Sequence, residues 1–421
     1  MEFKQYSSYK NSGVEWLGDV PEHWGMNRLG VHFRNRKEKV SDKDFKPLSV
    51  TKHGIVPQLE HAAKSDNGDN RKLVRKGDYV INSRSDRKGS SGLADLDGSV
   101  SLINIVLTPF KTIHPKFSHY LLRSYLFQEE FYKYGHGIVA DLWTTNYEDM
   151  RNIHLALPSV SEQTQISNFL EQETTRIDNL ISKQEKLIEL LEEQRKSIIS
   201  HAVTKGLNPN APMKDSGVEW LGEVPEDWEV KRFGYIFTEN KKKNIGLIET
   251  NVLSLSYGNI KEKNIDDNKG LLPESFETYQ IIEPNDIVFR FTDLQNDKRS
   301  LRNAISKYHG IITSAYIGVK TKENADFYNY LFRAYDLQKV FYSMGDGMRQ
   351  SLKMDELNKM PIVLPKIEAQ ERIVKFINEE NQRINNLVVK QKNLIEKLKE
   401  YRSSIISHAV TGKIDVREFG A

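Results

Sequence analysis

The sequence predicts an α/β protein in which two mixed α/β domains alternate with two long helices, which pair as an antiparallel coiled coil with pseudo-two-fold symmetry. Two repeats predict this architecture. A long segment occurs at residues 161–204 and again at 368–411, and both copies end in Ser-Ile-Ile-Ser-His-Ala-Val-Thr. A shorter segment at 12–24 recurs at 216–228 with 11 of 13 residues identical. Repeats of this length indicate a duplicated architecture.

The shorter repeat opens each domain. It reads Ser-Gly-Val-Glu-Trp-Leu-Gly-Asp-Val-Pro-Glu-His-Trp in the first copy, and the second copy differs only at Glu223 and Asp227. Its Trp, Leu, Val and Pro side chains are expected to pack on the domain that follows. We therefore interpret this segment, the lead-in, as structural rather than as a binding site.

Each domain continues with short strands and then a helix. Strands are expected at 47–52, 78–82 and 101–107, and in the second domain at 252–256, 286–290 and 313–319. Helices are expected at 119–134 and 325–343. These elements predict two mixed domains with curved sheets, which share a framework and differ in their loops.

The long repeat has the pattern of a coiled-coil helix, with mostly apolar residues in a strict alternation of four and three. Such a helix would extend about 60 Å at ~1.5 Å per residue. Ser159 and Glu162 are expected to form a capping box, and Gly206 and Gly412 to end the helices in a left-handed conformation. The expected seam consists of Ile166, Leu170, Glu173, Ile177, Leu180, Gln184, Leu187, Leu191, Gln194 and Ile198, and of Ile373, Ile377, Glu380, Ile384, Leu387, Gln391, Leu394, Leu398, Tyr401 and Ile405.

Charge indicates which partner each helix prefers. Residues 161–204 hold five Lys/Arg and eight Asp/Glu, a net charge of −3, whereas residues 368–411 hold eight and six, a net charge of +2. Opposite signs favour pairing of one copy with the other. Gln184 and Gln391, near the helix midpoints, either fix the register of the pair or are tolerated polar positions.

Composition excludes several classes of protein. The chain has no cysteine, so disulfides, thiolate catalysis and cysteine-ligated zinc are excluded. It has no run of 18 apolar residues and no signal-peptide core at its N-terminus, so we expect a cytoplasmic protein that does not span a membrane. We find no P-loop, no His-Glu-x-x-His motif, no Pro-Asp dipeptide and no Asn/Asp-Pro-Pro-Tyr/Phe motif, so no catalytic or metal site is predicted.

Basic residues cluster in loops of both domains. Seven Lys/Arg lie between Arg71 and Lys88 against two Asp, and eight lie between Arg28 and Lys52 against three acids. The second domain has Arg290, Lys298, Arg299 and Arg302 in one loop. Lys and Arg neutralise phosphates, and the Asn, Gln, Ser and Thr between them can read base edges. This pattern predicts contact with DNA.

Taken together, the layout resembles the specificity subunit of type I restriction-modification systems. The resemblance covers essentially the whole chain. It rests on the two Trp-Leu-Gly-x-Val-Pro-x-x-Trp lead-ins, on the Leu-Pro-x-x-x-x-Gln motifs from Leu157 to Gln163 and from Leu364 to Gln370, and on the repeated helix ends. The glutamate that usually precedes that glutamine is present as Glu162 but is replaced by Ala369 in the second copy.

The resemblance implies four regions and a function. Residues 1–157 and 207–363 would be target recognition domains, each reading one half of a bipartite site in the major groove of double-stranded DNA. Residues 158–206 and 364–421 would contain the conserved helices, which set the spacer and dock two methyltransferase (modification) subunits. Restriction/translocase subunits would join the complex. The chain itself would need no cofactor, because S-adenosylmethionine, ATP and magnesium would bind the partner subunits.

Loop position, rather than the resemblance, selects the expected DNA contacts. Removing an arginine that reads guanine should cost about 1–3 kcal/mol and relax one position of the site. The expected residues are Thr51, Lys52, Ser83, Arg84, Arg87 and Lys88 in the first domain and Tyr257, Arg290, Thr292, Gln295, Lys298, Arg299, Arg349 and Gln350 in the second.

Three alternatives remain open at this point. The chain could be the recognition subunit of a restriction enzyme whose single partner both methylates and cleaves. It could be a coiled-coil scaffold whose variable domains bind protein, which predicts no salt-dependent affinity for DNA. It could also be an enzyme with unrecognised catalytic residues.

Overall fold

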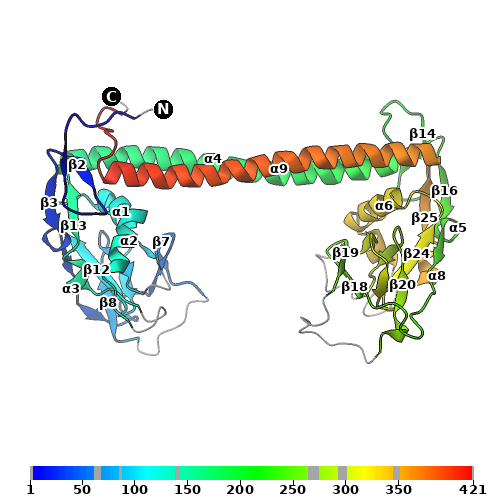
Figure 1. Ribbon diagram of the computed structural model, residues 1–421, viewed down its shortest axis with the longest axis horizontal. Coiled ribbons are helices and arrows are strands. Elements are labelled where there is room, and N and C mark those ends of the chain that lie inside the picture. Colours follow the sequence, from blue (N-terminus) through cyan, green and yellow to red (C-terminus); the bar gives the residue numbers. More distant parts are fainter. Residues whose placement is uncertain are drawn as a thin grey trace. The chain divides into compact units, whose positions relative to one another are not determined.

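Two compact units make up the computed structural model, which describes residues 3–60, 68–84, 88–137, 143–263, 275–292, 301–344 and 351–419. Unit 1 comprises Met1–Glu185 and Lys392–Ala421, and unit 2 comprises Lys186–Gln391. The long helices α4 (Val160–Lys205) and α9 (Ile367–Val410) each contribute one part to either unit (Figure 1).

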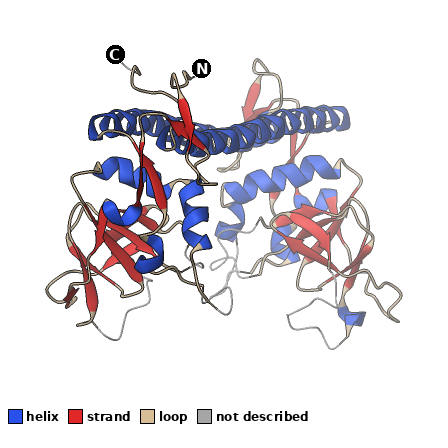
Figure 2. Cartoon of the chain, turned by 60° about the vertical axis from the view of Figure 1, so that its left-hand side comes forward, coloured by secondary structure: helices blue, strands red, loops and turns tan. Residues whose placement is uncertain are grey.

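Unit 1 is built on antiparallel sheets with helices beside them (Figure 2). Its elements are β1 (Tyr9–Asn11), β2 (Asp19–Pro21), β3 (Gly25–Arg28), η1 (Leu29–Val31), β4 (Phe33–Asn35), β5 (Lys39–Val40), β6 (Leu48–Thr51), β7 (Gly54–Pro57), β8 (Arg71–Val74), β9 (Tyr79–Asn82), β10 (Ser91–Leu93), β11 (Gly98–Val100), β12 (Asn104–Pro109), α1 (Pro115–Arg123), α2 (Tyr125–Lys133), α3 (Tyr147–Met150) and β13 (His154–Leu157). The main sheet has the order β10-β9-β12-β4, and a second has the order β11-β8-β5. The pairs β1-β2, β3-β13 and β6-β7 complete the described strands.

Unit 2 repeats this topology. Its elements are β14 (Met213–Asp215), β15 (Glu223–Pro225), β16 (Glu229–Arg232), α5 (Phe233–Ile236), β17 (Phe237–Glu239), β18 (Leu253–Ser256), β19 (Asn259–Glu262), η4 (Phe276–Thr278), β20 (Gln280–Ile282), β21 (Ile287–Phe289), β22 (Asn303–Ile305), β23 (Gly310–Ile312), β24 (Ile317–Thr321), α6 (Ala325–Leu337), α7 (Val340–Met344), α8 (Met354–Leu357) and β25 (Pro361–Leu364). The order β22-β21-β24-β17 matches β10-β9-β12-β4 strand for strand. The pairs β20-β23, β18-β19, β16-β25 and β14-β15 also have counterparts in unit 1.

Each predicted domain helix is two helices. In unit 1 the chain becomes extended at Ser124, whose ψ is 146° and whose side chain accepts a hydrogen bond from Phe127 N at 3.3 Å. Ser124 therefore caps α2 and separates it from α1. In unit 2 the break falls at Lys339, which has a φ of +64°. The prediction of a single helix was wrong in both units, because local capping and a left-handed residue interrupt the apolar pattern.

The strand predictions were correct for most positions and wrong at two. The third strand of unit 1 is β12, which begins at Asn104 rather than at Ser101. The segment predicted at 313–319 spans a turn after β23 and the first part of β24. Turn residues 313–316 read Thr-Ser-Ala-Tyr and lack the Gly or Pro that would have marked the boundary.

Both lead-ins pack on their domains, as predicted. Trp24 is fully buried, and Trp228 is 3% exposed. Each tryptophan also lies against the glycine that ends a long helix, because a β-carbon at Gly412 would lie 3.2 Å from Trp24 and one at Gly206 would lie 3.4 Å from Trp228. The φ angles of +72° at Gly412 and +78° at Gly206 confirm the predicted left-handed helix ends.

The capping box predicted for α4 forms only in part. Glu162 N donates to Ser159 Oγ at 3.3 Å, but the Glu162 carboxylate does not return to Ser159. It accepts hydrogen bonds from Tyr6 Oη at 2.9 Å and from Trp24 Nε1 at 3.2 Å. Tertiary contacts therefore take the side chain that the local motif would have used.

The two long helices contact each other in an antiparallel sense within each unit. In unit 1 Arg402 donates to Asp178 at 2.9 Å, and Phe419, nine residues beyond the end of α9, packs on Phe169 in the first turns of α4 with ring centroids 4.6 Å apart. In unit 2 Arg195 donates to Asn385 at 2.7 Å.

The seam differs from the prediction at alternate positions. In α4, Leu187 is 39% exposed, and the neighbouring Ile188 packs in the interhelical cluster with Leu191. In α9, Leu394 is 41% exposed and Ile395 is 6% exposed. The same displacement by one residue recurs at Gln194, Leu387 and Tyr401, where Arg195, Val388 and Arg402 are more buried. Leu180 and Ile181 are both half-buried. A helix with 3.6 residues per turn drifts from a strict seven-residue repeat, and both neighbours are apolar at several of these steps, so periodicity alone could not choose. Gln184 and Gln391 are half-buried, and their role in register stays a prediction.

Candidate nucleic-acid interface

A β-hairpin turn projects from each unit, and in unit 1 it belongs to β6-β7. The turn residues Lys52 and His53 are exposed. The Thr51 hydroxyl donates to the Gly54 carbonyl at 3.0 Å and accepts from the His53 backbone N–H at 3.0 Å. Thr51 therefore shapes the turn, whereas Lys52 and His53 present their side chains to solvent.

The corresponding turn in unit 2 joins β18 to β19. Tyr257 and Gly258 have φ angles of +48° and +72°, and Tyr257 is 71% exposed. Two successive positive φ angles are typical of a type I′ turn, which matches the twist of the flanking strands. A β-carbon at Gly258 would lie 2.6 Å from Leu301 Cδ1. Glycine is therefore required there, and Tyr257 is the side chain that this turn presents.

A helix arginine holds each turn in place. Arg123 at the end of α1 donates to the Lys52 carbonyl, and Arg333 of α6 donates to the Gly258 carbonyl. Sequence reasoning missed both arginines. The signal was present, because Tyr-Leu-Leu-Arg at 120–123 matches Tyr-Leu-Phe-Arg at 330–333. Equivalent helix arginines of the duplicated framework thus hold two turns of different chemistry, at the first turn residue in unit 1 and at the second in unit 2.

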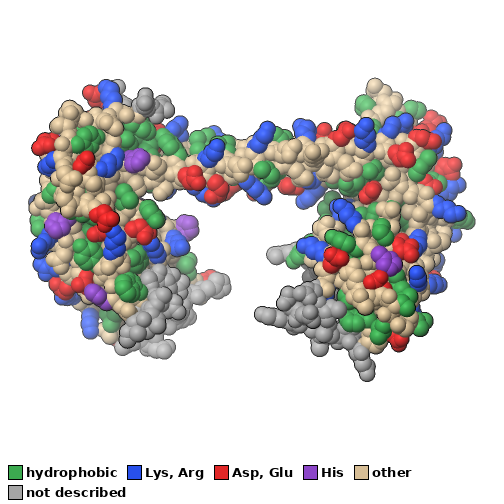
Figure 3. Space-filling view, viewed as in Figure 1, with side chains coloured by type: hydrophobic (Ala, Val, Ile, Leu, Met, Phe, Trp, Pro, Cys, Tyr) green, Lys and Arg blue, Asp and Glu red, His purple; other side chains and the backbone are tan. Residues whose placement is uncertain are grey.

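A basic recess of about 900 Å³ lies beside the hairpin turn of unit 1. Asp178 is the one carboxylate among its described lining residues. Figure 3 shows Lys, Arg and His side chains on this unit below the long helices. The cations that line the recess are Lys52, Lys88, Arg123, Lys399 and Arg402, which come from the turn, the loop before β10, α1 and α9.

Some of these charges are neutralised and others are available. Lys88 forms an ion pair with Glu129 and lies 5.5 Å from the centroid of the Tyr132 ring. Arg402 and Lys399 pair with carboxylates of the long helices. In the part of the chain that the structure describes, Lys52 forms no ion pair. Lys52 is therefore best placed to contact an incoming phosphate.

His119 lines the recess as a neutral side chain. Its Nδ1 accepts a hydrogen bond from Leu93 N at 3.3 Å. Burial, and then the charges of Arg123 and Arg402, lower the pKa of His119 to about 4. His119 consequently stays neutral across the neutral range.

Ser83 and Arg84 line a second recess of unit 1, of about 550 Å³. Ser83 is 7% exposed and donates to the Ile103 carbonyl at 2.5 Å, so its hydroxyl serves the framework. Arg84 is exposed. Tyr132 contacts one residue of each recess. Its hydroxyl donates to the Arg84 carbonyl at 3.5 Å, and Lys88 lies 5.5 Å from the centroid of its ring.

In unit 2 the described candidates do not gather in one recess. Tyr257 is exposed, whereas Arg290 and Thr292 are half-buried. The Arg290 backbone N–H pairs with the Arg302 carbonyl at 2.7 Å, and the Thr292 carbonyl accepts from the Arg302 guanidinium at 3.3 Å. The remaining predicted residues, Arg87, Gln295, Lys298, Arg299, Arg349 and Gln350, lie outside the described residues.

Three arginines of the basic clusters belong to the framework. Arg302 is fully buried and stacks on Tyr342 at 5.7 Å. Arg71 is 5% exposed and donates to the hydroxyl of Ser99 at 2.8 Å. Arg36 forms an ion pair with buried Asp78 at 2.7 Å. Counting charges along the sequence therefore overstated the basic surface, because these arginines lie in or beside strands and satisfy buried polar groups.

Within the described ranges, no group of three or more His, Asp or Glu side chains is arranged to hold a metal ion. No helix among the same residues is long and apolar enough to span a membrane. The described arrangement is thus a charged and hydrogen-bonding surface on a duplicated framework.

Comparison with known proteins shows which of them this chain resembles. No protein-family model matches the chain. The chain is 23% identical over 448 aligned residues to the MjaX type I restriction enzyme specificity subunit of Methanocaldococcus jannaschii, covering 99% of both chains. It is 26% identical over 286 residues to the MjaVIII specificity subunit of the same organism, covering 63% of each.

Solved structures share the fold. A chain from a structure that concerns complex assembly and conformational transition of the type I restriction-modification system aligns with a TM-score of 0.64, 16% identity and coverage of 93% of this chain and 98% of that one. The HsdS subunit of Thermoanaerobacter tengcongensis aligns with a TM-score of 0.55, 17% identity and coverage of 94% and 98%. These matches confirm the resemblance that the repeats and motifs indicate.

Proposed function

We propose that this chain, a specificity subunit of the type I restriction-modification family, recognises a bipartite DNA site in which each unit reads one half. The observation that carries this proposal is the pair of hairpin turns. The same framework and the same helix arginine hold Lys52-His53 in unit 1 and Tyr257-Gly258 in unit 2. Two domains that read different half-sites require a shared framework that carries different residues at its turns.

The basic recess supplies affinity, and the turn supplies part of the specificity. Lys52 and Arg123 stand where they can neutralise phosphates, which fixes the position of the duplex without reading its sequence. His53, Arg84 and Tyr257 are candidates for contact with base edges. The residues outside the described ranges, from Arg87 to Gln350, are proposed as further contacts on the grounds of loop position.

The long helices are proposed to act as the spacer between the half-site readers. Asp178 pairs with Arg402, and Arg195 is bonded to Asn385. Arg195 follows Asp178 by the same number of residues by which Asn385 precedes Arg402. One antiparallel register therefore accounts for both contacts. A coiled coil of α4 and α9 in that register would hold the two readers at a fixed separation.

The partners of the proposed complex are two modification subunits, which would dock on the helices, and restriction/translocase subunits. S-adenosylmethionine, ATP and magnesium would bind those partners. The present chain is proposed to have no catalytic role, because its sequence holds none of the catalytic motifs sought above. We place the complex in the cytoplasm, where host DNA is.

The test is to co-express the chain with the modification subunit encoded beside it and to map methylated adenines by single-molecule sequencing. We expect one bipartite motif with a fixed spacer. Exchanging residues 25–150 for the same region of another specificity subunit should change one half of the motif and leave the other intact. A complex that forms but methylates no defined motif would contradict DNA recognition and favour a protein-binding scaffold.

A further inference from the structure

The turn that joins β11 to β12 in unit 1 carries apolar side chains at both of its central positions. Asn104 N donates to the Ser101 carbonyl at 3.0 Å, which closes a β-turn with Leu102 and Ile103 in the middle. Leu102 is 38% exposed and Ile103 is 39% exposed. Turns more commonly hold Gly, Pro, Asn, Asp or Ser, so an exposed Leu-Ile pair is unusual there.

The equivalent turn in unit 2 shows that the shared framework does not require this pair. It joins β23 to β24, and Tyr316 N donates to the Thr313 carbonyl at 3.2 Å. Its central residues are Ser314 and Ala315, both of which are exposed. The same turn therefore forms with small residues, and the Leu-Ile pair distinguishes the surface of unit 1 from that of unit 2.

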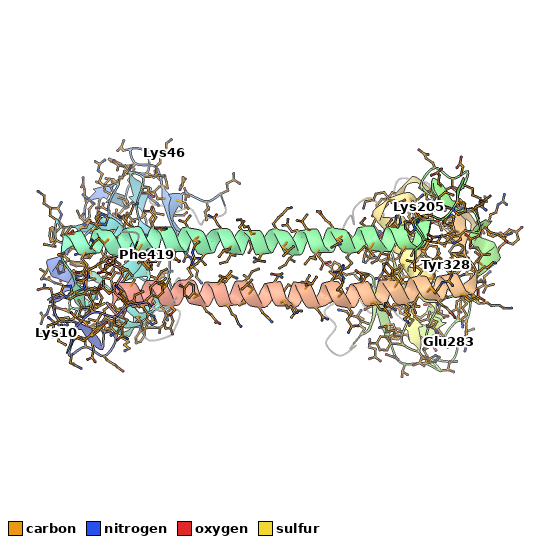
Figure 4. All side chains as sticks on the ribbon, turned by 90° about the horizontal axis from the view of Figure 1, so that it is seen from above. Lys10, Lys46, Lys205, Glu283, Tyr328 and Phe419 are labelled. Carbon is orange, nitrogen blue, oxygen red and sulfur yellow. The ribbon has the colours of Figure 1, made fainter. Side chains whose placement is uncertain are left out.

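Hydrogen bonds on both sides fix the turn of unit 1. The Asn104 side-chain amide donates to the Ser101 carbonyl at 3.0 Å, and Lys72 Nζ donates to the Asn104 carbonyl at 2.6 Å. On the β11 side, Ser99 N donates at 3.0 Å to the carbonyl of Lys46, which is labelled in Figure 4. A turn held in this way presents its two central side chains in one place, so little ordering is needed when they bind.

The turn adjoins the loop in which the sequence predicts DNA contacts. The Ser83 hydroxyl donates to the Ile103 carbonyl at 2.5 Å. Leu102 and Ile103 line the second recess together with Ser83 and Arg84. The apolar pair thus belongs to the same surface as the exposed Arg84 side chain.

The charges of this recess favour an anionic occupant. Lys37, Lys72 and Arg84 line it, and Glu148 is the one carboxylate among its described lining residues. Glu148 already lies 3.2 Å from Arg151 and 3.9 Å from Lys37. An apolar pair flanked by cations suits a DNA groove between its phosphates better than the core of a protein interface, where charged residues are depleted.

We propose that Leu102 and Ile103 contact the C5-methyl group of a thymine in the half-site that unit 1 reads. This methyl is the apolar group that base pairs expose in the major groove, and contact with an apolar side chain distinguishes thymine there. The inference rests on the proposed DNA recognition and specifies the chemistry of one contact. Unit 2, with Ser314 and Ala315 at the equivalent turn, lacks this methyl contact.

The test uses the complex of this chain with the modification subunit and the duplex that methylome mapping identifies. Exchange of residues 25–150 assigns one half of the motif to unit 1, and each thymine of that half is then replaced by deoxyuridine, which lacks only the methyl group. One replacement should weaken binding about fourfold, as expected when one methyl group is no longer buried. The double variant Leu102→Ser/Ile103→Ala should bind the thymine and deoxyuridine duplexes equally. It carries the residues of the unit 2 turn, so folding should be retained.

The matched control is Leu96→Ser, because Leu96 is 46% exposed and lies before β11, at the end of that strand opposite to the turn. It should keep the fourfold effect. If the wild type prefers its motif to a scrambled duplex but no thymine of that half responds, or if the response persists in the double variant, the methyl contact is refuted and DNA recognition stands. Equal affinity of the wild type for motif and scrambled duplex would contradict both proposals. Loss of the modification subunit from the double variant without DNA would assign the turn to protein docking and overturn the methyl contact.

Discussion

The side-chain oxygen of Gln163 accepts a hydrogen bond from the backbone N–H of His114 at 2.8 Å, which joins the first turn of α4 to the start of α1. Gln370 repeats this contact in unit 2, where it accepts from Asn324 N at 3.1 Å at the start of α6. Both glutamines are fully buried. The glutamine of the Leu-Pro-x-x-x-x-Gln motif therefore fixes each domain on its long helix.

Gln163→Ala should destabilise unit 1 by about 2–3 kcal/mol, because it leaves the His114 N–H and two carbonyls without partners in the interior. The Gln163 amide also donates to Pro158 O at 3.0 Å and to Thr112 O at 3.2 Å. Urea unfolding monitored by tryptophan fluorescence measures the change. Gln165→Ala is the control, since Gln165 is exposed on the same turn and should shift the midpoint little.

Lys52→Ala should weaken binding to all DNA sequences alike. If Lys52 neutralises one phosphate, the slope of log K against log salt should become less steep by about 0.9. Affinities of the modification complex for a cognate and a scrambled duplex, measured at several salt concentrations, provide the test. Lys111→Ala removes an exposed lysine outside the recess and should leave the slope unchanged. A Lys52→Ala effect confined to the cognate duplex would instead assign Lys52 to base reading.

Tyr257→Ala should alter only one half of the recognised motif, because the side chain is exposed at the turn of unit 2 and forms no hydrogen bond, ion pair or ring contact with the residues that the structure describes. Relaxed recognition of one position corresponds to a loss of about 1–3 kcal/mol for the correct base. Methylome mapping of the variant complex measures this. Replacement of His53 by alanine tests the turn of unit 1 and should affect the other half. If both variants and the wild type methylate the same motif, the turns do not take part in base recognition.

Sequence periodicity and repetition predicted the duplicated frame well, for a physical reason. Trp24, Trp228 and the glycines after the helices occupy positions where few residues fit, so the two copies remained alike. The failures occurred where two solutions were equally compatible with the pattern. Leu187 and Ile188 are both apolar, and only packing against α9 decides between them.

The candidate site was less predictable, because charge does not reveal exposure. Arg302 and Lys52 both lie in basic segments, yet Arg302 is buried under Tyr342 while Lys52 stands at a hairpin turn. Arg123 and Arg402 reach the recess from helices far apart in sequence. Contacts of this kind depend on tertiary structure, which a loop-by-loop reading of charge cannot provide.

Acid should destabilise unit 1 through His119. The pKa of His119 is about 4 in the folded protein, below the ordinary histidine pKa of 6.5, so the unfolded chain binds the proton more readily. The stability due to neutral His119 is complete above pH 6.5 and is lost as the pH falls towards 4, by about 3 kcal/mol in total. Urea unfolding at pH 7 and pH 5 measures the change. His119→Gln should reduce the pH dependence in this window, and His154→Gln, at an exposed position, should not.

Lys413 and Lys205 make the same contact with different consequences, which allows a matched test. Lys413 Nζ donates to Leu17 O at 2.8 Å, and Lys205 Nζ donates to Leu221 O at 2.9 Å. Lys205 is close in sequence to the lead-in that it contacts, whereas Lys413 holds a segment near one end of the chain against a lead-in near the other end.

Each Lys→Met change removes a charged hydrogen bond that contributes about 1.5–3 kcal/mol when buried and less at these half-exposed positions. Chain ends fray once released, so Lys413→Met should permit rapid tryptic cleavage near Arg417, while Lys205→Met should leave the connecting segment resistant. Limited proteolysis followed by mass spectrometry distinguishes the two, and equal cleavage in both variants would show that the end is not held by this contact.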